Sequence, residues 1–132
     1  MKRIFLCAAV LSFSSHILAE VNFCDLIEPL GGRVGVKQVI WDTQTEAAKF
    51  TDMAGEEFLG SITNAKPHDK GQKLNLRFHF DDADFLGFDS AEFIVFPVGG
   101  THRVIGVGYI EKDDYEHLSG LVSNSDANCV KL

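Results

Sequence analysis

Residues 73–81, KLNLRFHFD, alternate between polar and apolar side chains from end to end. In an extended chain, alternate residues share a face, so the apolar members lie on one side and the polar members on the other. A period of two predicts a β-strand with one buried side and one solvated side. We therefore expect a fold built on a sheet, with this face turned to the core: Leu74, Leu76, Phe78 and Phe80.

Further strands are predicted on both sides of this stretch, because β-branched and aromatic residues cluster there between turn residues. No segment between them is long enough for the helical crossovers of a parallel sheet, so we expect antiparallel pairing. One stretch, 92–98, is apolar on both faces, which predicts a central strand or one covered by a helix. Besides 73–81, the predicted strands are 34–41, 48–51, 57–63, 92–98 and 103–111.

Two short helices are predicted, one near each end of the mature chain. Asn22 is a favourable cap for residues 22–27, and Pro29 follows soon after the last of them. Asp113 precedes Glu116 by three residues, the spacing of a capping box. The expected fold class is therefore α+β and β-rich. It has a single antiparallel sheet of five or six strands, a curled sheet or small sandwich, with short helices near both termini.

The first residues are typical of a secretory signal peptide. Lys2 and Arg3 precede an apolar run at 4–13, and Ala19 supplies a small residue for cleavage. The run is too short to span a bilayer, so no membrane insertion is expected after cleavage. We expect residues 1–19 to be removed and residues 20–132 to form a single disulfide-stapled globular domain, periplasmic or secreted.

Cysteine usage agrees with export. Cys7 would leave with the signal peptide, and Cys24 and Cys129 would remain, one near each end of the domain. An isolated pair in an oxidising compartment predicts a disulfide rather than two reactive thiols. Because the two Cα atoms of a disulfide lie close together, the ends of the domain are expected to meet in space.

The charge of the chain restricts its partners. It holds 19 acidic and 12 basic residues, and losing the signal peptide would change the formal net charge from −7 to −9. Such a charge disfavours nucleic acid and anionic membrane surfaces. It is compatible with a cationic protein partner, although the charge can equally serve solubility alone.

The sequence carries no pattern that predicts catalysis, a cofactor or a metal. Asp82, Asp84 and Gly87 match three places of a calcium-binding loop, but Phe93 stands where the last carboxylate ligand should be. The histidines lack metal-binding spacing. There is no nucleophile elbow or phosphate-binding loop. We therefore expect a protein that is not an enzyme.

One segment, 66–73, is locally basic in this acidic chain. Pro67 restricts its freedom, so less entropy is lost when it docks. Its basic groups can pair with catalytic carboxylates such as those of a muramidase. The candidate partner-binding residues are Lys66, His68 and Lys70. They suggest a protein-binding protein, an inhibitor or immunity protein that blocks a cell-wall hydrolase or a delivered toxin. A solvated hairpin tip without function is the competing interpretation.

The sequence is also compatible with a second function, the binding of a small ligand. Gly106 and Gly108 fall on one face of the predicted strand at 103–111, where they allow another backbone or a ligand to approach closely. The chain also holds 11 phenylalanines. Together these features suggest an apolar pocket and a carrier for a small apolar ligand, or simply a core rich in phenylalanine.

Overall fold

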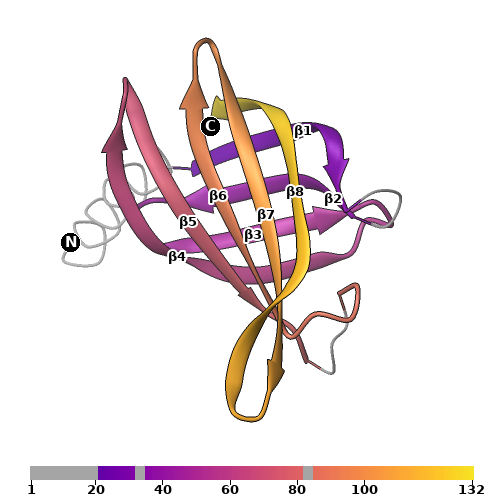
Figure 1. The fold of residues 1–132 in the computed structure, drawn as a ribbon. Coiled ribbons are helices and arrows are strands. Elements are labelled where there is room, and N and C mark those ends of the chain that lie inside the picture. Colours follow the sequence, from indigo (N-terminus) through magenta and orange to yellow (C-terminus); the bar gives the residue numbers. More distant parts are fainter. Residues whose placement is uncertain (1–20, 32–34, 82–84) are drawn as a thin grey trace, which may run out of the picture.

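The computed structural model describes residues 21–31, 35–81 and 85–132, with the backbone alone at 118–122. These residues form a closed barrel of antiparallel strands (Figure 1). Each strand pairs with the next along the chain, and the last pairs with the first. The strands are β1 (Val21–Leu30), β2 (Val36–Asp42), β3 (Ala47–Asp52), β4 (Glu57–His68), β5 (Gly71–His79), β6 (Ser90–Val98), β7 (Thr101–Lys112) and β8 (Tyr115–Lys131).

The predicted α+β fold is wrong, because both predicted helices are strands or turns. Residues 22–27 lie within β1, and Glu116 lies in β8. Asp113 and Asp114 form the turn between β7 and β8, with φ angles of 55° and 63°, as a two-residue hairpin requires. An open sheet would leave two edges with unpaired backbone groups, whereas pairing β1 with β8 removes both edges. The barrel therefore has eight strands instead of five or six.

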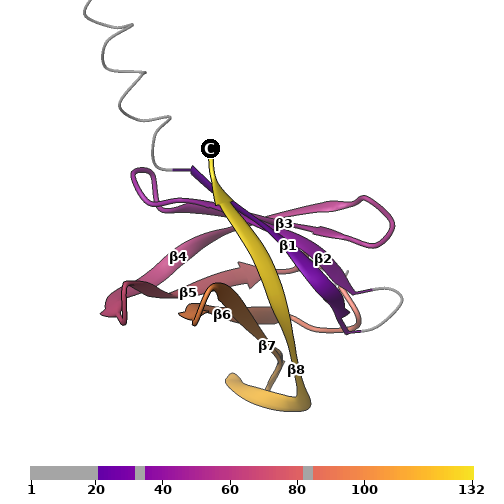
Figure 2. The same cartoon turned by 90° about the horizontal axis from the view of Figure 1, so that it is seen from above.

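The predicted strands themselves are confirmed. The alternating stretch forms β5, in which Leu74, Leu76 and Phe78 are buried while Asn75 and Arg77 lie on the outer face. Figure 2 shows β1–β3 on one side of the barrel and β5–β7 on the other, with the interior between them. Among the described residues, we find no helix that is long and apolar enough to cross a membrane.

The predicted disulfide is confirmed, and it lies on the seam where the barrel closes. Cys24 of β1 and Cys129 of β8 are direct partners in the strand register, with their Cα atoms 4.0 Å apart. The bond therefore joins the first strand to the last. It is compatible with an oxidising compartment outside the cytoplasm. The predicted signal peptide, 1–19, lies outside the described residues.

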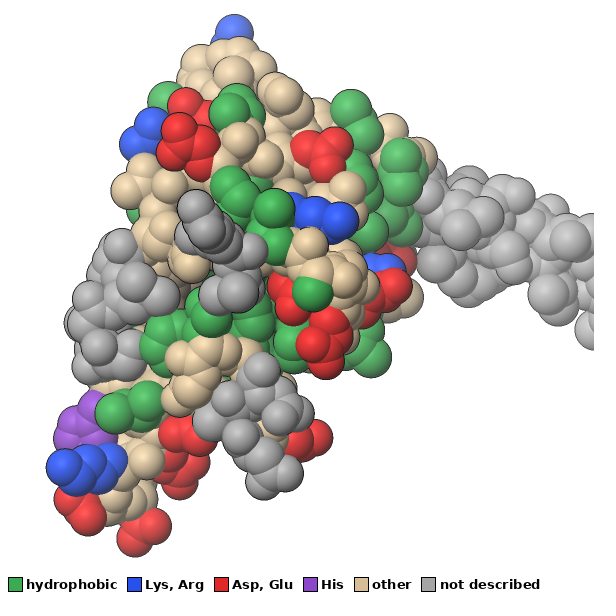
Figure 3. All heavy atoms as spheres, turned by 90° about the vertical axis from the view of Figure 1, so that its right-hand side faces the viewer, with side chains coloured by type: hydrophobic (Ala, Val, Ile, Leu, Met, Phe, Trp, Pro, Cys, Tyr) green, Lys and Arg blue, Asp and Glu red, His purple; other side chains and the backbone are tan. Residues whose placement is uncertain are grey.

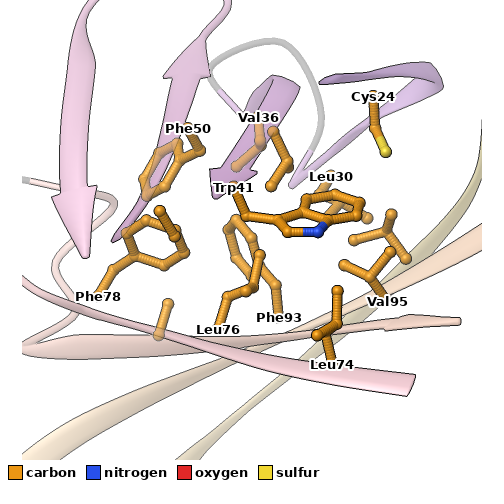
Figure 4. Packing of buried hydrophobic residues seen from close by; sticks show 14 of the residues in the cluster. Cys24, Leu30, Val36, Trp41, Phe50, Leu74, Leu76, Phe78, Phe93 and Val95 are labelled. Carbon is orange, nitrogen blue, oxygen red and sulfur yellow. The ribbon is translucent and has the colours of Figure 1, made fainter. Parts of the chain in front are cut away.

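Aromatic side chains fill the barrel interior. Phe50 lies among them, with ring centroids 4.7 Å from Phe58, 4.8 Å from Phe78 and 4.9 Å from Phe85. Figure 4 shows Phe50 and Phe78 side by side in one part of the core and Trp41 in another, toward Leu74 and Val95. Eight strands enclose a space that side chains alone can fill. The interior is thus a packed core.

Candidate functional site

The basic segment is the outer end of a β-hairpin, which we call the hairpin tip (residues 66–73). Lys66 pairs with Lys73 across β4 and β5, and His68 pairs with Gly71. Lys70 lies in the turn between the strands. Every residue of the hairpin tip is exposed, and Figure 1 shows it at the same end of the barrel as the β6–β7 hairpin.

The outer face of the hairpin tip is positively charged. Lys66 and His68 are two residues apart in β4 and so share a face, and Lys73 lies directly opposite Lys66. Like charges placed directly opposite each other on neighbouring strands repel. Asp69 is the single carboxylate between positions 66 and 73. A negatively charged group between the two lysines would relieve this repulsion.

Two residues of β6 support the hairpin tip. The ring of His68 meets the ring of Phe96 edge to face, with centroids 5.6 Å apart. Gly71 lies against Pro97, whose Cγ would be 3.3 Å from a Cβ at position 71. These contacts hold the tip against the barrel wall. A supported loop loses less conformational entropy on binding than a free one.

Beside the hairpin tip, the barrel opens into a pocket of about 380 Å³, which we call the barrel mouth. Trp41, Leu74 and Val95 lie at its base, and all three are buried in the core. Lys70 and His102 lie in its wall, and burial lowers the pKa of His102 below its usual value of about 6.5. Among the described residues, the mouth is also lined by Asn22, Thr43, Gly71, Gln72 and Lys131.

Of the three predicted binding residues, the structure brings two together. Lys66 and His68 share the outer face of the hairpin tip, whereas Lys70 lines the barrel mouth. Sequence reasoning missed the mouth, because its residues come from several strands. The only local signal was Trp41, the single tryptophan of the chain.

The opposite end of the barrel is acidic. There Glu116 of the β7–β8 hairpin pairs with Arg77 of β5 and accepts a hydrogen bond of 2.7 Å from Ser90 Oγ. Figure 3 shows carboxylates at the lower end of the molecule, beside a basic side chain and a histidine. A hollow of about 190 Å³ lies here, lined by His79, Asp89, Ser90, Glu111, Asp114 and Glu116. In the part of the chain that the structure describes, no three His, Cys, Asp or Glu residues are grouped to hold a metal ion. The calcium-like residues Asp82 and Asp84 lie outside it.

The space beside Gly106 and Gly108 is occupied by the chain itself. A Cβ at position 106 would lie 3.2 Å from Leu30 Cδ1, and one at position 108 would lie 2.6 Å from the ring of Phe88. The apolar cavity left beside them is about 20 Å³, close to the volume that one water molecule occupies. The glycine face therefore receives side chains of the core, which weighs against the ligand-carrier interpretation.

Comparison with protein-family models, with curated proteins and with solved structures found no match to this chain. Its function must be argued from the geometry of the hairpin tip and the barrel mouth.

Proposed function

We propose that this is a small protein-binding protein, periplasmic or secreted, that inhibits another protein. The hairpin tip enters the active-site cleft of its partner and blocks it. The partner is a cell-wall hydrolase or a delivered toxin, for which this chain would be the immunity protein.

The observation that carries this proposal is the opposition of Lys66 and Lys73 on an exposed hairpin. Two lysines that repel each other gain most when an anionic group comes between them. Glycoside hydrolases hold a pair of carboxyl groups at the bottom of a cleft. A narrow hairpin supported by Phe96 and Pro97 has a shape and a charge that suit such a cleft.

The compartment is part of the same proposal. The expected signal peptide at 1–19 would bring the chain to the periplasm or beyond, where the Cys24–Cys129 disulfide is stable. The net negative charge of the protein would attract a partner whose surface is cationic. The hairpin tip is basic instead, and it would face the catalytic carboxylates of that partner.

The first experiment identifies the partner. The mature protein is immobilised and exposed to periplasmic and secreted fractions of the producing strain and of its competitors. We expect it to retain a hydrolase or toxin whose activity falls when the mature protein is added. Recovery of no such protein from any of these fractions would count against the proposal as a whole.

A second experiment tests the hairpin tip once a partner is known. Replacing Lys66→Ala, His68→Ala and Lys70→Ala together should weaken the complex by about threefold to a hundredfold, since exposed ion pairs contribute roughly 0.2–1 kcal/mol each. The matched control is Lys37→Ala with Lys112→Ala, which removes positive charge away from the tip. Equal affinity of the triple variant and the wild type would show that another surface binds the partner.

A further inference from the structure

Three cationic side chains and an aromatic ring form a row across the outer face of the barrel, which we call the cationic row. Lys66 of β4 pairs with Lys73 of β5, and Phe96 of β6 pairs with Arg103 of β7. The register of β5 against β6 places Lys73 next to Phe96. Neighbouring strands lie about 4.8 Å apart, so the row extends over roughly 14 Å.

The charges of the cationic row are accessible to a ligand. In the described part of the chain, neither Lys66 nor Lys73 forms an ion pair. Arg103 pairs with Asp126 of β8 at 3.0 Å, and the two side chains are 43% and 49% exposed. An exposed ion pair of this kind contributes little, and the guanidinium has more N–H donors than the pair uses. The row therefore offers cationic donors on both sides of Phe96.

The middle of the cationic row is an apolar platform. The rings of His68 and Phe96 meet edge to face, with centroids 5.6 Å apart. Gly71, the strand partner of His68, has no side chain to separate them. Val98 is two residues beyond Phe96 on the same face of β6 and is 47% exposed. A ligand with apolar faces between its charged groups would use this platform.

A second row lies beside the first, two residues further along each strand, and we call it the asparagine row. It carries no charge, and its members are direct partners across five strands: Asn64, Asn75, Ile94, Ile105 and Asn124. Its amides can both donate and accept hydrogen bonds, as hydroxyl groups require. Its isoleucines continue the apolar platform. The two rows together suit carboxylates, hydroxyl groups and the apolar C–H faces of sugar rings.

We propose that the cationic row and the asparagine row bind an acidic polysaccharide that lies across β4–β8 (Figure 1). A nucleic acid fits this surface less well. Duplex DNA carries one negative charge per about 1.7 Å of its length, which the formal net charge of −7 would repel. An acidic polysaccharide has fewer charges and more hydroxyl groups for the amides. The inference goes beyond the proposed inhibition and does not rest on it, although both use Lys66.

The test measures binding of a labelled oligogalacturonate by fluorescence anisotropy as the purified protein is added. A neutral dextran oligomer and single-stranded DNA are measured in the same way. We expect saturable binding of the oligogalacturonate that weakens as the salt concentration rises, and at least tenfold weaker binding of the other two. No binding of the oligogalacturonate would overturn the proposal. Equal binding of dextran or of DNA would also overturn it. No enzyme is present, so either result leaves the proposed inhibition untouched.

Variants locate the polysaccharide on the two rows. Lys66→Gln with Lys73→Gln should weaken oligogalacturonate binding about two- to thirtyfold, as expected for two exposed ion pairs. The matched control is Lys37→Gln with Lys112→Gln, which removes the same charge from β2 and from the end of β7. Asn124→Ala should weaken binding without changing its salt dependence, because it removes an amide and no charge. Circular dichroism establishes that each variant is folded. Wild-type affinity in the first lysine pair variant would overturn the proposal, since the polysaccharide would then bind elsewhere.

Discussion

The ring of Phe88 occupies the space that a side chain on Gly108 would need. A Cβ at position 108 would lie 2.6 Å from two atoms of that ring, closer than real Cβ contacts allow. Phe88 belongs to the connection between β5 and β6, and its backbone N–H donates a hydrogen bond of 3.0 Å to the carbonyl oxygen of Phe85. Glycine is required at 108 because a neighbouring ring approaches the backbone there.

This contact predicts that Gly108→Ala destabilises the fold. The new methyl group must displace Phe88, and overfilling a packed core typically costs about 1–3 kcal/mol. Urea unfolding followed by circular dichroism measures the change. The matched control is Gly100→Ala, where nothing lies within 4 Å of the new Cβ, and it should change stability by less than about 0.5 kcal/mol. Similar midpoints for the two variants would contradict the assignment of Phe88 as the obstacle.

Gly106 and Gly108 show which part of the packing the sequence predicts and which part it does not. Their alternation in β7 predicted that another part of the molecule approaches the glycine face of this strand closely, and the structure shows such an approach. The sequence did not show that the approaching groups would be Leu30 and Phe88. Periodicity identifies the face of a strand, but it says nothing about which connection folds back onto it.

The disulfide gives a second prediction. Cys24→Ala with Cys129→Ala removes a bond that closes a loop of 105 residues, for which the chain-entropy model gives an upper figure of about 5 kcal/mol. We expect the variant to unfold at a markedly lower urea concentration than the oxidised wild type. The wild type in the presence of a reductant should approach the variant, whereas Cys7→Ala in the full chain should change nothing. A disulfide variant as stable as the wild type would mean that strand pairing alone closes the barrel.

The strands that the sequence missed are the two that this disulfide joins. β8 turns small and polar residues inward, Ser123 and Ser125 among them, so it lacks the apolar stripe that marked β5. β1 changes register between Asp25 and Leu30. In both regions, the helix-capping residues Asn22 and Asp113 therefore gave a stronger local signal than any alternation typical of a strand. Pairing between chain ends is non-local, and no short window of sequence contains it.

The inward serines give a third prediction. Ser125 Oγ accepts a hydrogen bond of 3.0 Å from the backbone N–H of Glu28, where β1 departs from regular pairing. Ser125→Ala leaves that N–H without its partner, which should cost about 1–2 kcal/mol of unfolding free energy. Ser61→Ala, on the exposed outer face of β4, is the control and should be nearly neutral. Equal effects of the two changes would mean that solvent replaces the lost acceptor.

The candidate site was predicted only in part, for a related reason. Lys66, His68 and Lys70 follow one another closely, so composition alone pointed to them. The barrel mouth joins residues from β1, β2, β5, β6, β7 and β8 and from two turns. Such a pocket exists only once the barrel closes, and barrel closure was the feature that the sequence did not predict.

His102 in the barrel mouth gives the last prediction. Burial lowers its pKa in the folded protein below its usual value of about 6.5, which the unfolded chain retains. Below pH 6.5 the unfolded chain therefore binds a proton more readily than the folded protein, and folding stability falls as the pH falls. His102→Gln removes this contribution. Urea midpoints measured from pH 5 to pH 8 should show a smaller loss of stability on acidification for the variant. Above pH 7.5 the imidazole is neutral in both the folded and the unfolded state. The difference in urea midpoint between the variant and the wild type should therefore be constant there. Parallel curves across the whole range would show that His102 does not contribute to the acid sensitivity of the fold.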